Sequence, residues 1–154
     1  MLVSEILRIK GSTLYSATPD MSVADAVHSM ADNDIGSLVV MDKGKLVGML
    51  TFRELIKVLD ARGHELKGLS VSEIMERDPL TSEPGMDVQA LRKSMLDRHA
   101  RYIPVMDAGT LMGVLSFHDV AKAVYEEQSF ENRMLKSYIK NWPDEEETTA
   151  QPLS

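Results

Sequence analysis

The sequence of 154 residues contains no cysteine, and this absence removes several kinds of chemistry. Without cysteine there are no disulfides, no thiolate metal ligands and no cysteine nucleophiles. Disulfides are typical of oxidising compartments, so their absence favours a reducing one. We therefore expect a cytoplasmic protein whose fold depends on packing rather than on covalent cross-links.

Long apolar runs are also missing. No stretch approaches the ~20 residues that a membrane-spanning helix requires, so we expect no contact with a membrane. The first apolar stretch carries Glu5, and no small-residue cleavage site follows it. We therefore expect no secretory signal.

Positive charge is scarce, with 17 lysines and arginines against 24 aspartates and glutamates and a net charge of −7. Binding to a nucleic-acid backbone usually requires a basic surface, so we expect no nucleic-acid partner. A small basic pocket on an acidic protein can still hold one phosphorylated metabolite. The charge balance therefore disfavours a class of macromolecular partner but not a small anionic ligand.

Catalytic motifs are missing as well. The four histidines (His28, His64, His99 and His118) are scattered and show no spacing typical of a metal site, so we expect no metal. Ser116 and His118 are two residues apart with no third group to orient them, which does not fit a hydrolytic triad. The glycines form neither a phosphate-binding P-loop nor a dinucleotide fingerprint. We therefore predict that the protein is not an enzyme.

The most informative feature of the chain is an internal repeat. MDKGKLVGMLTFREL, from Met41, aligns with MDAGTLMGVLSFHDV, from Met106, at an offset of 65 residues. Further upstream, VSEIL at Val3 matches VSEIM at Val71 at an offset of 68, so the first copy holds three extra residues. This self-similarity predicts two homologous halves.

Each half shows the same order of expected elements. A short helix at Val3–Leu7 or Val71–Met75 leads through a loop and a brief extended stretch to a second helix. This second helix has apolar residues at helical spacing after the N-cap candidates Ser22 and Asp87. Two apolar runs follow, with a glycine between them that favours a hairpin turn, and a last helix closes each half. The runs are Leu38–Met41 and Leu46–Leu50 in the first half, and Ile103–Met106 and Leu111–Leu115 in the second.

The pattern divides the chain into five parts. Residues 3–60 form the first motif, residues 61–70 a polar, glycine-containing linker, and residues 71–125 the second motif. Residues 126–142 alternate apolar and charged side chains and predict a C-terminal helix, and residues 143–154 predict a disordered acidic tail. A half of about 55 residues buries too little surface to be stable alone, so the halves should pack together. We expect an α/β (α+β) fold of two small sheets flanked by helices.

Two segments of the repeat carry a family resemblance. GKLVGMLTFREL and TLMGVLSFHDV each follow a hydrophobic strand, LVVMD or IPVMD, and HARYIPVMD places an arginine before the second strand. From about Val3 to Val124 this pattern resembles CBS (cystathionine-β-synthase) domains. The resemblance implies a stand-alone CBS pair with pseudo-twofold symmetry, often a disc-shaped homodimer, that binds an adenosine nucleotide between its motifs.

The residues best suited to a ligand lie where a strand meets the last helix of each half. Ser116 and Thr51 offer a hydroxyl and exposed amide groups to a phosphate. Asp119 and Glu54, one helical turn later, can accept hydrogen bonds from both hydroxyls of a ribose. The same spacing fits a capping box, in which the acid and the hydroxyl only terminate the helix. The two interpretations are compatible, because a helix N-terminus both requires capping and attracts anions.

The resemblance adds further residues to these sites. Glu54 stands where the family has aspartate, and its extra methylene carries the carboxylate past the ribose, so we expect weaker binding at Thr51. For the site of Ser116 and Asp119, the resemblance implies an adenine wall and two phosphate partners, namely Thr18, Ala24, Gly36 and Ser37, with Arg101 and His118. For the weaker site it implies Arg53 and Tyr102 beside Thr51 and Glu54.

We predict a non-catalytic regulatory module that senses an adenosine nucleotide. AMP leads the candidates because the site suits adenosine with a proximal phosphate, and ADP, ATP and NAD are the others. The alternative is a purely structural homodimer that regulates an unknown partner without a ligand. We expect a homodimer in either case, because apolar residues on the helices exceed what two small sheets can cover. Among these residues are Val23, Val27, Met30, Leu55, Leu59, Val120 and Val124.

Overall fold

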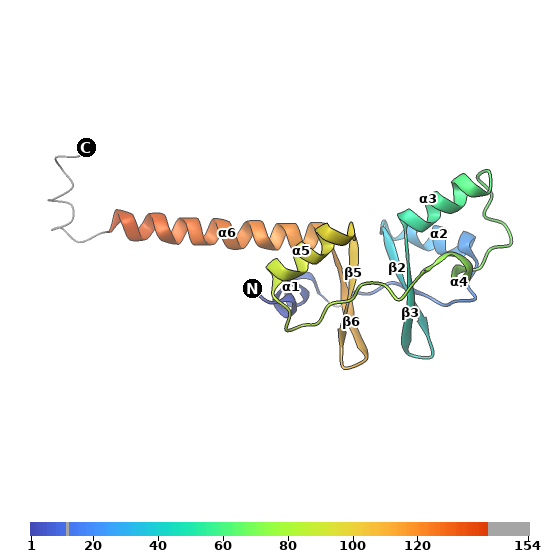
Figure 1. The fold of residues 1–154 in the computed structure, drawn as a ribbon, viewed down its shortest axis with the longest axis horizontal. Coiled ribbons are helices and arrows are strands. Elements are labelled where there is room, and N and C mark those ends of the chain that lie inside the picture. The colour runs from blue at the N-terminus through green and yellow to red at the C-terminus, as the bar shows by residue number, and fades with distance from the viewer. Residues whose placement is uncertain (12, 142–154) are drawn as a thin grey trace.

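The computed structural model describes residues 1–11 and 13–141. It is an α/β structure of two sheets with helices packed against them, as predicted (Figure 1). The first sheet has the strand order β1-β2-β3-β4 and the second the order β5-β6. The expected tail, residues 143–154, lies outside the described residues. In chain order the elements are α1 (Val3–Lys10), β1 (Ser16–Ala17), α2 (Val23–Asp32), β2 (Ser37–Asp42), β3 (Lys45–Thr51), α3 (Phe52–Ala61), α4 (Val71–Ile74), β4 (Glu76–Arg77), α5 (Val88–Arg98), β5 (Tyr102–Asp107), β6 (Thr110–Ser116) and α6 (Phe117–Lys140).

Each half is built around a two-stranded hairpin. β2 pairs with β3, and β5 pairs with β6, both in antiparallel orientation. At the first turn Lys43 and Gly44 have φ angles of 52° and 80°, and at the second Ala108 and Gly109 have φ angles of 48° and 84°. Two consecutive left-handed residues form the tight turn that matches the twist of the strands. The predicted hairpins are confirmed in both halves.

The helix starts follow the capping pattern of the sequence. The Ser22 side chain accepts a hydrogen bond from the Asp25 amide at the start of α2. The Asp87 carboxylate accepts hydrogen bonds from the amides of Gln89 and Ala90 at the start of α5. These bonds satisfy amide groups that have no partner within the helix, so both helices begin where the sequence predicts.

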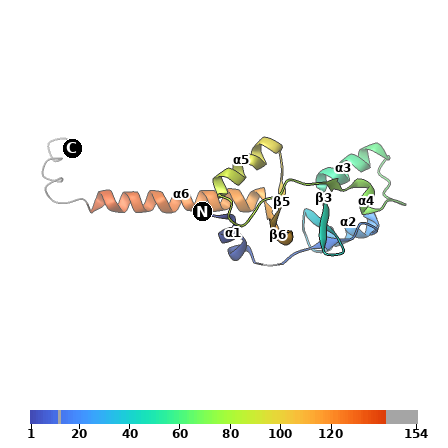
Figure 2. The ribbon, with the colours of Figure 1, turned by 60° about the horizontal axis from the view of Figure 1, so that its bottom comes forward.

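The first helical segment of each half packs into the other half (Figure 2). Val3 and Ile6 of α1 belong to the second hydrophobic core, with residues of α5, α6 and the β5-β6 hairpin. Val71 and Met75 belong to the first core, with residues of α2, α3 and the β2-β3 hairpin. β4 also pairs with β3 and becomes the fourth strand of the first sheet. We call this arrangement the segment exchange.

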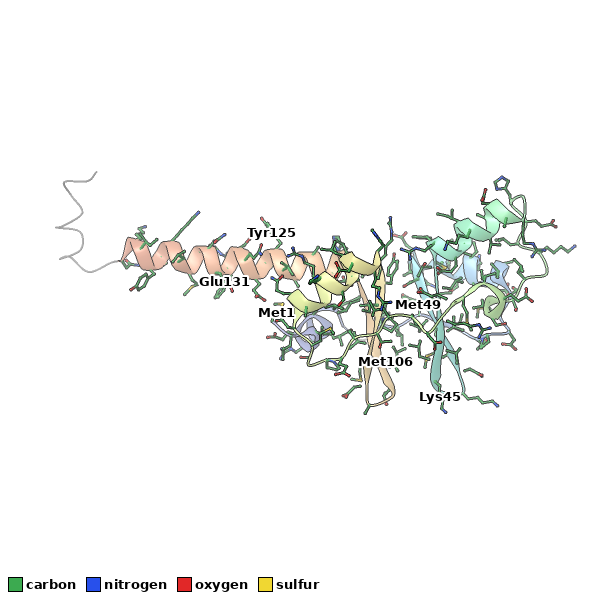
Figure 3. All side chains as sticks on the ribbon, in the orientation of Figure 1. Met1, Lys45, Met49, Met106, Tyr125 and Glu131 are labelled. Carbon is green, nitrogen blue, oxygen red and sulfur yellow. The ribbon has the colours of Figure 1, made fainter. Side chains whose placement is uncertain are left out.

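One helix replaces two expected ones at the end of the chain. The helix that closes the second motif and the expected C-terminal helix form one continuous helix, α6, because no glycine or proline interrupts residues 117–140. Its first part contributes Val120, Ala123 and Val124 to the core. Its second part extends away from the rest of the molecule, as Figure 3 shows around Tyr125 and Glu131.

The apolar residues cited above for a dimer are mostly internal to one chain. The exchanged segments and the sheets cover them, so their burial needs no second copy. Of the seven residues named there, five are at least 92% buried: Val23, Met30, Leu55, Val120 and Val124.

Other apolar side chains remain exposed on the helices. Phe52 and Ile56 of α3, Leu96 of α5 and Tyr125 of α6 are 50 to 70% exposed. A group of exposed apolar side chains of this size is typical of a protein interface. The buried residues of the helices are therefore not available to a second copy, whereas these four exposed residues are.

Candidate functional site

Asp119 lies in the first turn of α6 and takes part in a capping box. The Ser116 side chain accepts a hydrogen bond from the Asp119 amide at 3.0 Å, and Asp119 Oδ2 accepts one from the Ser116 amide at 2.9 Å. The capping interpretation of this motif is therefore correct. The second carboxylate oxygen, Oδ1, has no hydrogen-bond partner among the described residues. Asp119 can thus cap its helix and still offer an acceptor to a ligand.

Lys10, the last residue of α1, forms an ion pair with Asp119. Its Nζ donates hydrogen bonds to Asp119 Oδ2 and to the backbone carbonyl of Val114, each at 2.7 Å. Lys10 belongs to the first motif and reaches the second through the segment exchange. Partial burial raises the pKa of Asp119, but the hydrogen bonds from Lys10 and Ser116 outweigh this effect and hold the pKa below its ordinary value. Asp119 is therefore ionised at neutral pH and only accepts hydrogen bonds.

Glu54 occupies the related position at the start of α3 but points back onto its own cap. Its Oε1 accepts hydrogen bonds from the amide and from the hydroxyl of Thr51, both at 2.7 Å. The residue is 9% exposed. Asp119 accepts the corresponding bond from the Ser116 amide, and Glu54 differs in accepting a further bond from the hydroxyl of its own cap residue. Weaker ribose binding at Thr51 stays a prediction, and this geometry gives it a physical reason.

A cavity of about 340 Å³ opens beside Ser116, and we call it the Ser116 cavity. Residues from both motifs line it, including the predicted site residues Gly36 and Ser37. Lys10 is the one charged residue in the lining, so the wall is otherwise neutral. The complete lining is Lys10, Thr13, Leu14, Tyr15, Ile35, Gly36, Ser37, Tyr102, Val114 and Ser116.

A second cavity, of about 110 Å³, lies at the position that the repeat relates to the first, and we call it the Thr51 cavity. Adding 65 to residues 13–15 and 35–37 of the Ser116 cavity gives residues 78–80 and 100–102 of the Thr51 cavity. Subtracting 65 from Val114 and Ser116 gives Met49 and Thr51. The internal repeat therefore produces two related cavities between the motifs.

The two cavities differ in charge. Three arginines and two acids line the Thr51 cavity, namely Arg53, Arg98, Arg101, Glu76 and Asp78. The Ser116 cavity has Lys10 instead, and this lysine is paired with Asp119. The duplication has therefore preserved the positions of the lining residues more closely than their charges.

A third cavity, of about 600 Å³, lies between the end of α5 and the start of α6. We call it the arginine–histidine cavity, because Arg53, His99, Arg101 and His118 line it. No acidic residue of the described chain is part of this lining. The Arg53 guanidinium donates a hydrogen bond to the His99 carbonyl, which fixes it at the rim. The planar guanidinium groups suit phosphate oxygens, so this cavity can hold an anionic group.

Tyr102 lies where the three cavities meet, since it lines all of them. A Cβ atom built on Gly36 would lie 1.9 Å from the Tyr102 hydroxyl oxygen. Glycine at this position therefore lets the tyrosine ring reach from the second motif to the first. Met49, labelled in Figure 3, lies between the two motifs as well and lines the Thr51 cavity.

The structure brings some of the predicted site residues together and separates others. Gly36, Ser37 and Ser116 line the Ser116 cavity. The predicted phosphate partners Arg101 and His118 line the neighbouring arginine–histidine cavity instead. Two predicted wall residues line none of the three cavities: Thr18 is exposed after β1, and Ala24 is exposed on the first turn of α2.

Sequence reasoning missed several lining residues of the Ser116 cavity. Leu14, Tyr15 and Ile35 line this cavity, and Lys10 is the unexpected partner of Asp119. No local pattern marks Leu14, Tyr15 and Ile35, because they lie in the segments just before β1 and β2. The repeat offset does relate them to wall residues of the second cavity.

Two other kinds of site are not found in the part of the chain that the structure describes. No group of three or more histidines, aspartates and glutamates is placed to hold a metal ion there. No helix in the same part is long and apolar enough to span a bilayer.

The repeat, the paired hairpins and the paired cavities define a class of protein. The family model of the CBS domain matches the sequence twice, over residues 3–61 and over residues 71–126. The chain therefore belongs to the CBS domain family and consists mostly of a pair of these domains.

The similar proteins include other CBS-domain proteins. The chain is 32% identical over 146 residues to "CBS domain-containing protein CBSX3, mitochondrial" of Arabidopsis thaliana, a match that covers 89% of this chain and 71% of that protein. The crystal structure of a CBS-domain containing protein from Agrobacterium tumefaciens superposes with a TM-score of 0.76 at 30% identity, covering 80% of this chain and 98% of that one. An enzyme, inosine-5'-monophosphate dehydrogenase of Nitrosopumilus maritimus, matches at 27% identity over 25% of its own length.

Two more distant structures contain adenosine ligands. CBSX2 in complex with AMP has a TM-score of 0.68 at 22% identity, with 81% of this chain and 97% of that chain covered. The CBS domain pair of protein MJ0100, in complex with 5'-methylthioadenosine and S-adenosyl-L-methionine, has a TM-score of 0.71 at 24% identity, with 82% and 98% covered. At these identities the likeness shows a shared fold.

Proposed function

We propose that this protein is a non-catalytic regulatory module that binds an adenosine nucleotide between its two CBS domains. The observation that carries the proposal is the Ser116 cavity, with an open carboxylate oxygen of Asp119 beside it and the cationic arginine–histidine cavity adjoining it. The ligands of CBSX2 and of the MJ0100 pair are adenosine compounds and support this ligand class. AMP is the first candidate, and ADP, ATP, NAD and S-adenosylmethionine follow.

The site offers a different environment to each part of such a ligand. Asp119 accepts hydrogen bonds from the ribose. The wall around Gly36 and Ser37 is neutral and suits the adenine. The phosphates extend toward the arginines and histidines of the third cavity, because Ser116 and Tyr102 line both that cavity and the Ser116 cavity. This division matches the charge of each region to the charge of the ligand group.

Regulation follows from the position of the ligand between two motifs. A ligand that contacts both motifs favours the arrangement in which both contacts are made, to the extent that its affinity differs between arrangements. We also propose that the protein is a homodimer through the exposed helical face of Phe52, Ile56, Leu96 and Tyr125. A CBS-CP12 protein of similar fold is hexameric, which supports assembly as a property of such folds. In the proposed mechanism the ligand changes this assembly and, through it, a regulated partner protein.

A second candidate function is a purely structural homodimer that acts without a ligand. One observation favours it: both acids already have hydrogen-bond partners in the structure, Asp119 in Lys10 and Ser116, and Glu54 in Thr51. Neither carboxylate therefore needs a ligand to supply its hydrogen bonds in the folded protein.

Titration calorimetry on the Asp119→Asn variant separates the two functions. Asparagine keeps a side-chain oxygen that can cap α6 but removes the charge. We expect its affinity for AMP to fall at least tenfold, because a hydrogen bond to a charged group contributes about 1.5–3 kcal/mol. Glu54→Gln is the matched control in the first motif, and a smaller loss is expected because the Glu54 carboxylate is folded onto Thr51. If the wild-type protein binds none of the five adenosine compounds named above, the ligand-sensing function is refuted and the structural function is favoured.

A further inference from the structure

The second part of α6 projects from the rest of the molecule, and we call residues 126–140 the α6 arm. Both views of the ribbon show it extending past the second motif (Figures 1 and 2). Every residue from Phe130 to Asn141 is exposed. A helix of about this length is marginally stable in water by itself, and helices in proteins owe most of their stability to the packing of an apolar face. The α6 arm would therefore gain stability from a cover over its apolar side chains.

These apolar side chains continue the face by which α6 packs on the second core. Met134 and Tyr138 follow the buried Val120 and Val124 by 14 residues, which is close to four turns of helix. Phe130 precedes Met134 by four residues and therefore lies in the same row. The row is symmetric about Met134, with one aromatic residue four positions before it and another four positions after it. The exposed apolar residues of the arm are Phe130, Met134, Leu135, Tyr138 and Ile139, each 56 to 62% exposed.

The charged residues of the α6 arm are separated by sign along its length. The first half carries only acids and the second half only cations. In chain order these residues are Glu126, Glu127, Glu131, Arg133, Lys136 and Lys140. A second arm in antiparallel orientation brings an acidic half against a basic half at both ends, whereas a parallel arm brings like charges together. The charge pattern is therefore complementary to itself in the antiparallel orientation.

The sum of these charges disfavours a lipid surface as the cover. Three acids and three cations give the α6 arm a net charge of zero. Amphipathic helices that lie on acidic membranes carry an excess of lysine and arginine on their polar face. A second arm, in contrast, matches both the apolar row and the division of charge.

We propose that two copies of this chain pair through their α6 arms in antiparallel orientation, about a twofold axis at Met134. Met134 then contacts Met134 of the second copy, and Phe130 lies opposite Tyr138 of the second copy, so that methionine and aromatic side chains pack together. Glu126 comes within one turn of Lys140 of the second copy. This surface is distinct from the face of Phe52, Ile56, Leu96 and Tyr125 and involves none of the three cavities. The inference therefore goes beyond the proposed function and does not depend on a ligand.

A second symmetric surface has a consequence for assembly. A chain with two different twofold surfaces can join dimers into tetramers or longer arrays. The α6 arm offers few apolar residues, and small interfaces are weak and transient. We therefore expect the arms to pair only above the micromolar range, and to link the dimers formed through the other face.

Disulfide trapping tests the orientation, because the chain has no cysteine of its own. Full-length Phe130→Cys and Tyr138→Cys are oxidised separately and as a mixture. We expect the mixture to form the linked dimer about tenfold faster than either variant alone, since only the mixture brings two thiols together. Lys45→Cys, at the exposed hairpin tip labelled in Figure 3, is the control and should not link to Phe130→Cys above background.

Light scattering on the Ile56→Glu variant measures the strength of the pairing without the other face. Its mass should rise from 17.2 kDa toward twice that value when the concentration is raised about a hundredfold above micromolar. Adding Lys140→Glu should weaken the pairing about fivefold, because an attraction becomes a repulsion at both ends. Adding Glu126→Lys as well should restore it, which an unfolded arm would not do. Lys45→Glu makes the same change of charge away from the arm and should have no effect.

The outcomes separate the possible covers of the α6 arm. Linking of Phe130→Cys to itself as fast as to Tyr138→Cys would show parallel arms and overturn the inference. Linking only in variants that end at Asn141 would show that residues 142–154 cover the arm instead. Binding of the protein to phosphatidylserine vesicles without any linking would assign the arm to a lipid surface. A constant mass of 17.2 kDa in Ile56→Glu, with no linking, would overturn the inference and leave the proposed function standing.

Discussion

Gly48 and Gly113 occupy the same position in the two halves, and an alanine at each of them tests the packing of the exchanged segments. A Cβ atom on Gly48 would lie 2.6 Å from the sulfur of Met75 and 2.8 Å from the backbone oxygen of Glu76. A Cβ atom on Gly113 would meet the Cδ2 atom of Leu7 at 2.9 Å. Neither glycine is in the left-handed region, so alanine itself fits both backbones. The two substitutions therefore differ only in what the new methyl group displaces.

The expected magnitudes follow from these contacts. The Glu76 oxygen belongs to β4, which pairs with β3 through Gly48 and Met49, so it cannot move without opening the sheet edge. Overpacking of this kind costs about 1–3 kcal/mol, and we expect Gly48→Ala to lie near the upper end. For a chain of this length that loss lowers the melting temperature by about 5–10 °C. Leu7 is a flexible side chain that can rotate away, so Gly113→Ala should cost less than about 1 kcal/mol.

Thermal melts and urea unfolding of both variants, beside the wild-type protein, measure the difference. Gly113→Ala serves as the control, because it makes the same chemical change at the same place in the repeat. If Gly48→Ala were as stable as the wild-type protein, Met75 and Glu76 would not pack on β3. If both variants lost the same free energy, the cause would be the strand position and not the exchanged segment.

Two further results are expected. Ser82 is 2% exposed, and its hydroxyl has no hydrogen-bond partner among the described residues, whereas the first motif has Ala17 at the same position. Ser82→Ala should therefore raise the free energy of unfolding, measured in urea, by about 1 kcal/mol. A loss of stability would mean that the hydroxyl has a hydrogen-bond partner. Light scattering at micromolar concentration should give a mass of twice the 17.2 kDa of one chain, and Ile56→Glu should reduce the mass to that of one chain. A wild-type mass of 17.2 kDa would contradict the dimer.

Features that depend on neighbouring residues could be predicted from the sequence. The glycines at 44 and 109 mark the hairpin turns, because a left-handed residue is required there. Ser22 and Asp87 mark the helix starts, because the cap needs only an oxygen three residues before an amide. The repeat then predicts two copies of the same layers. These signals are local or periodic, and tertiary packing did not change them.

Features that depend on distant residues could not be predicted. The apolar face of α1 shows that Val3 and Ile6 are buried, but it does not show against which core. The pair of Lys10 and Asp119 joins residues 109 positions apart, and no spacing rule relates them. The path of the chain before β1 brings Leu14 and Tyr15 to the Ser116 cavity, which no local pattern predicts, and the ligand wall of Thr18 and Ala24 stays a prediction from the resemblance. The end of the second motif predicts a boundary between two helices. The structure has one continuous helix there, because no residue at that boundary interrupts α6.

The segment exchange also constrains how the chain can fold while it is being synthesised. Domains that are complete in themselves can fold as they leave the ribosome, the N-terminal one first. Here the first motif lacks Val71, Met75 and β4 until translation has passed residue 77. Val3 and Ile6, made before the rest of the pair, belong to a core that is complete only when Val124 has been added. Within the pair, α1 is therefore made first and is among the last helices to find its place, and a ribosome that stalls in the linker would hold a first half with an open core and an unmatched helix.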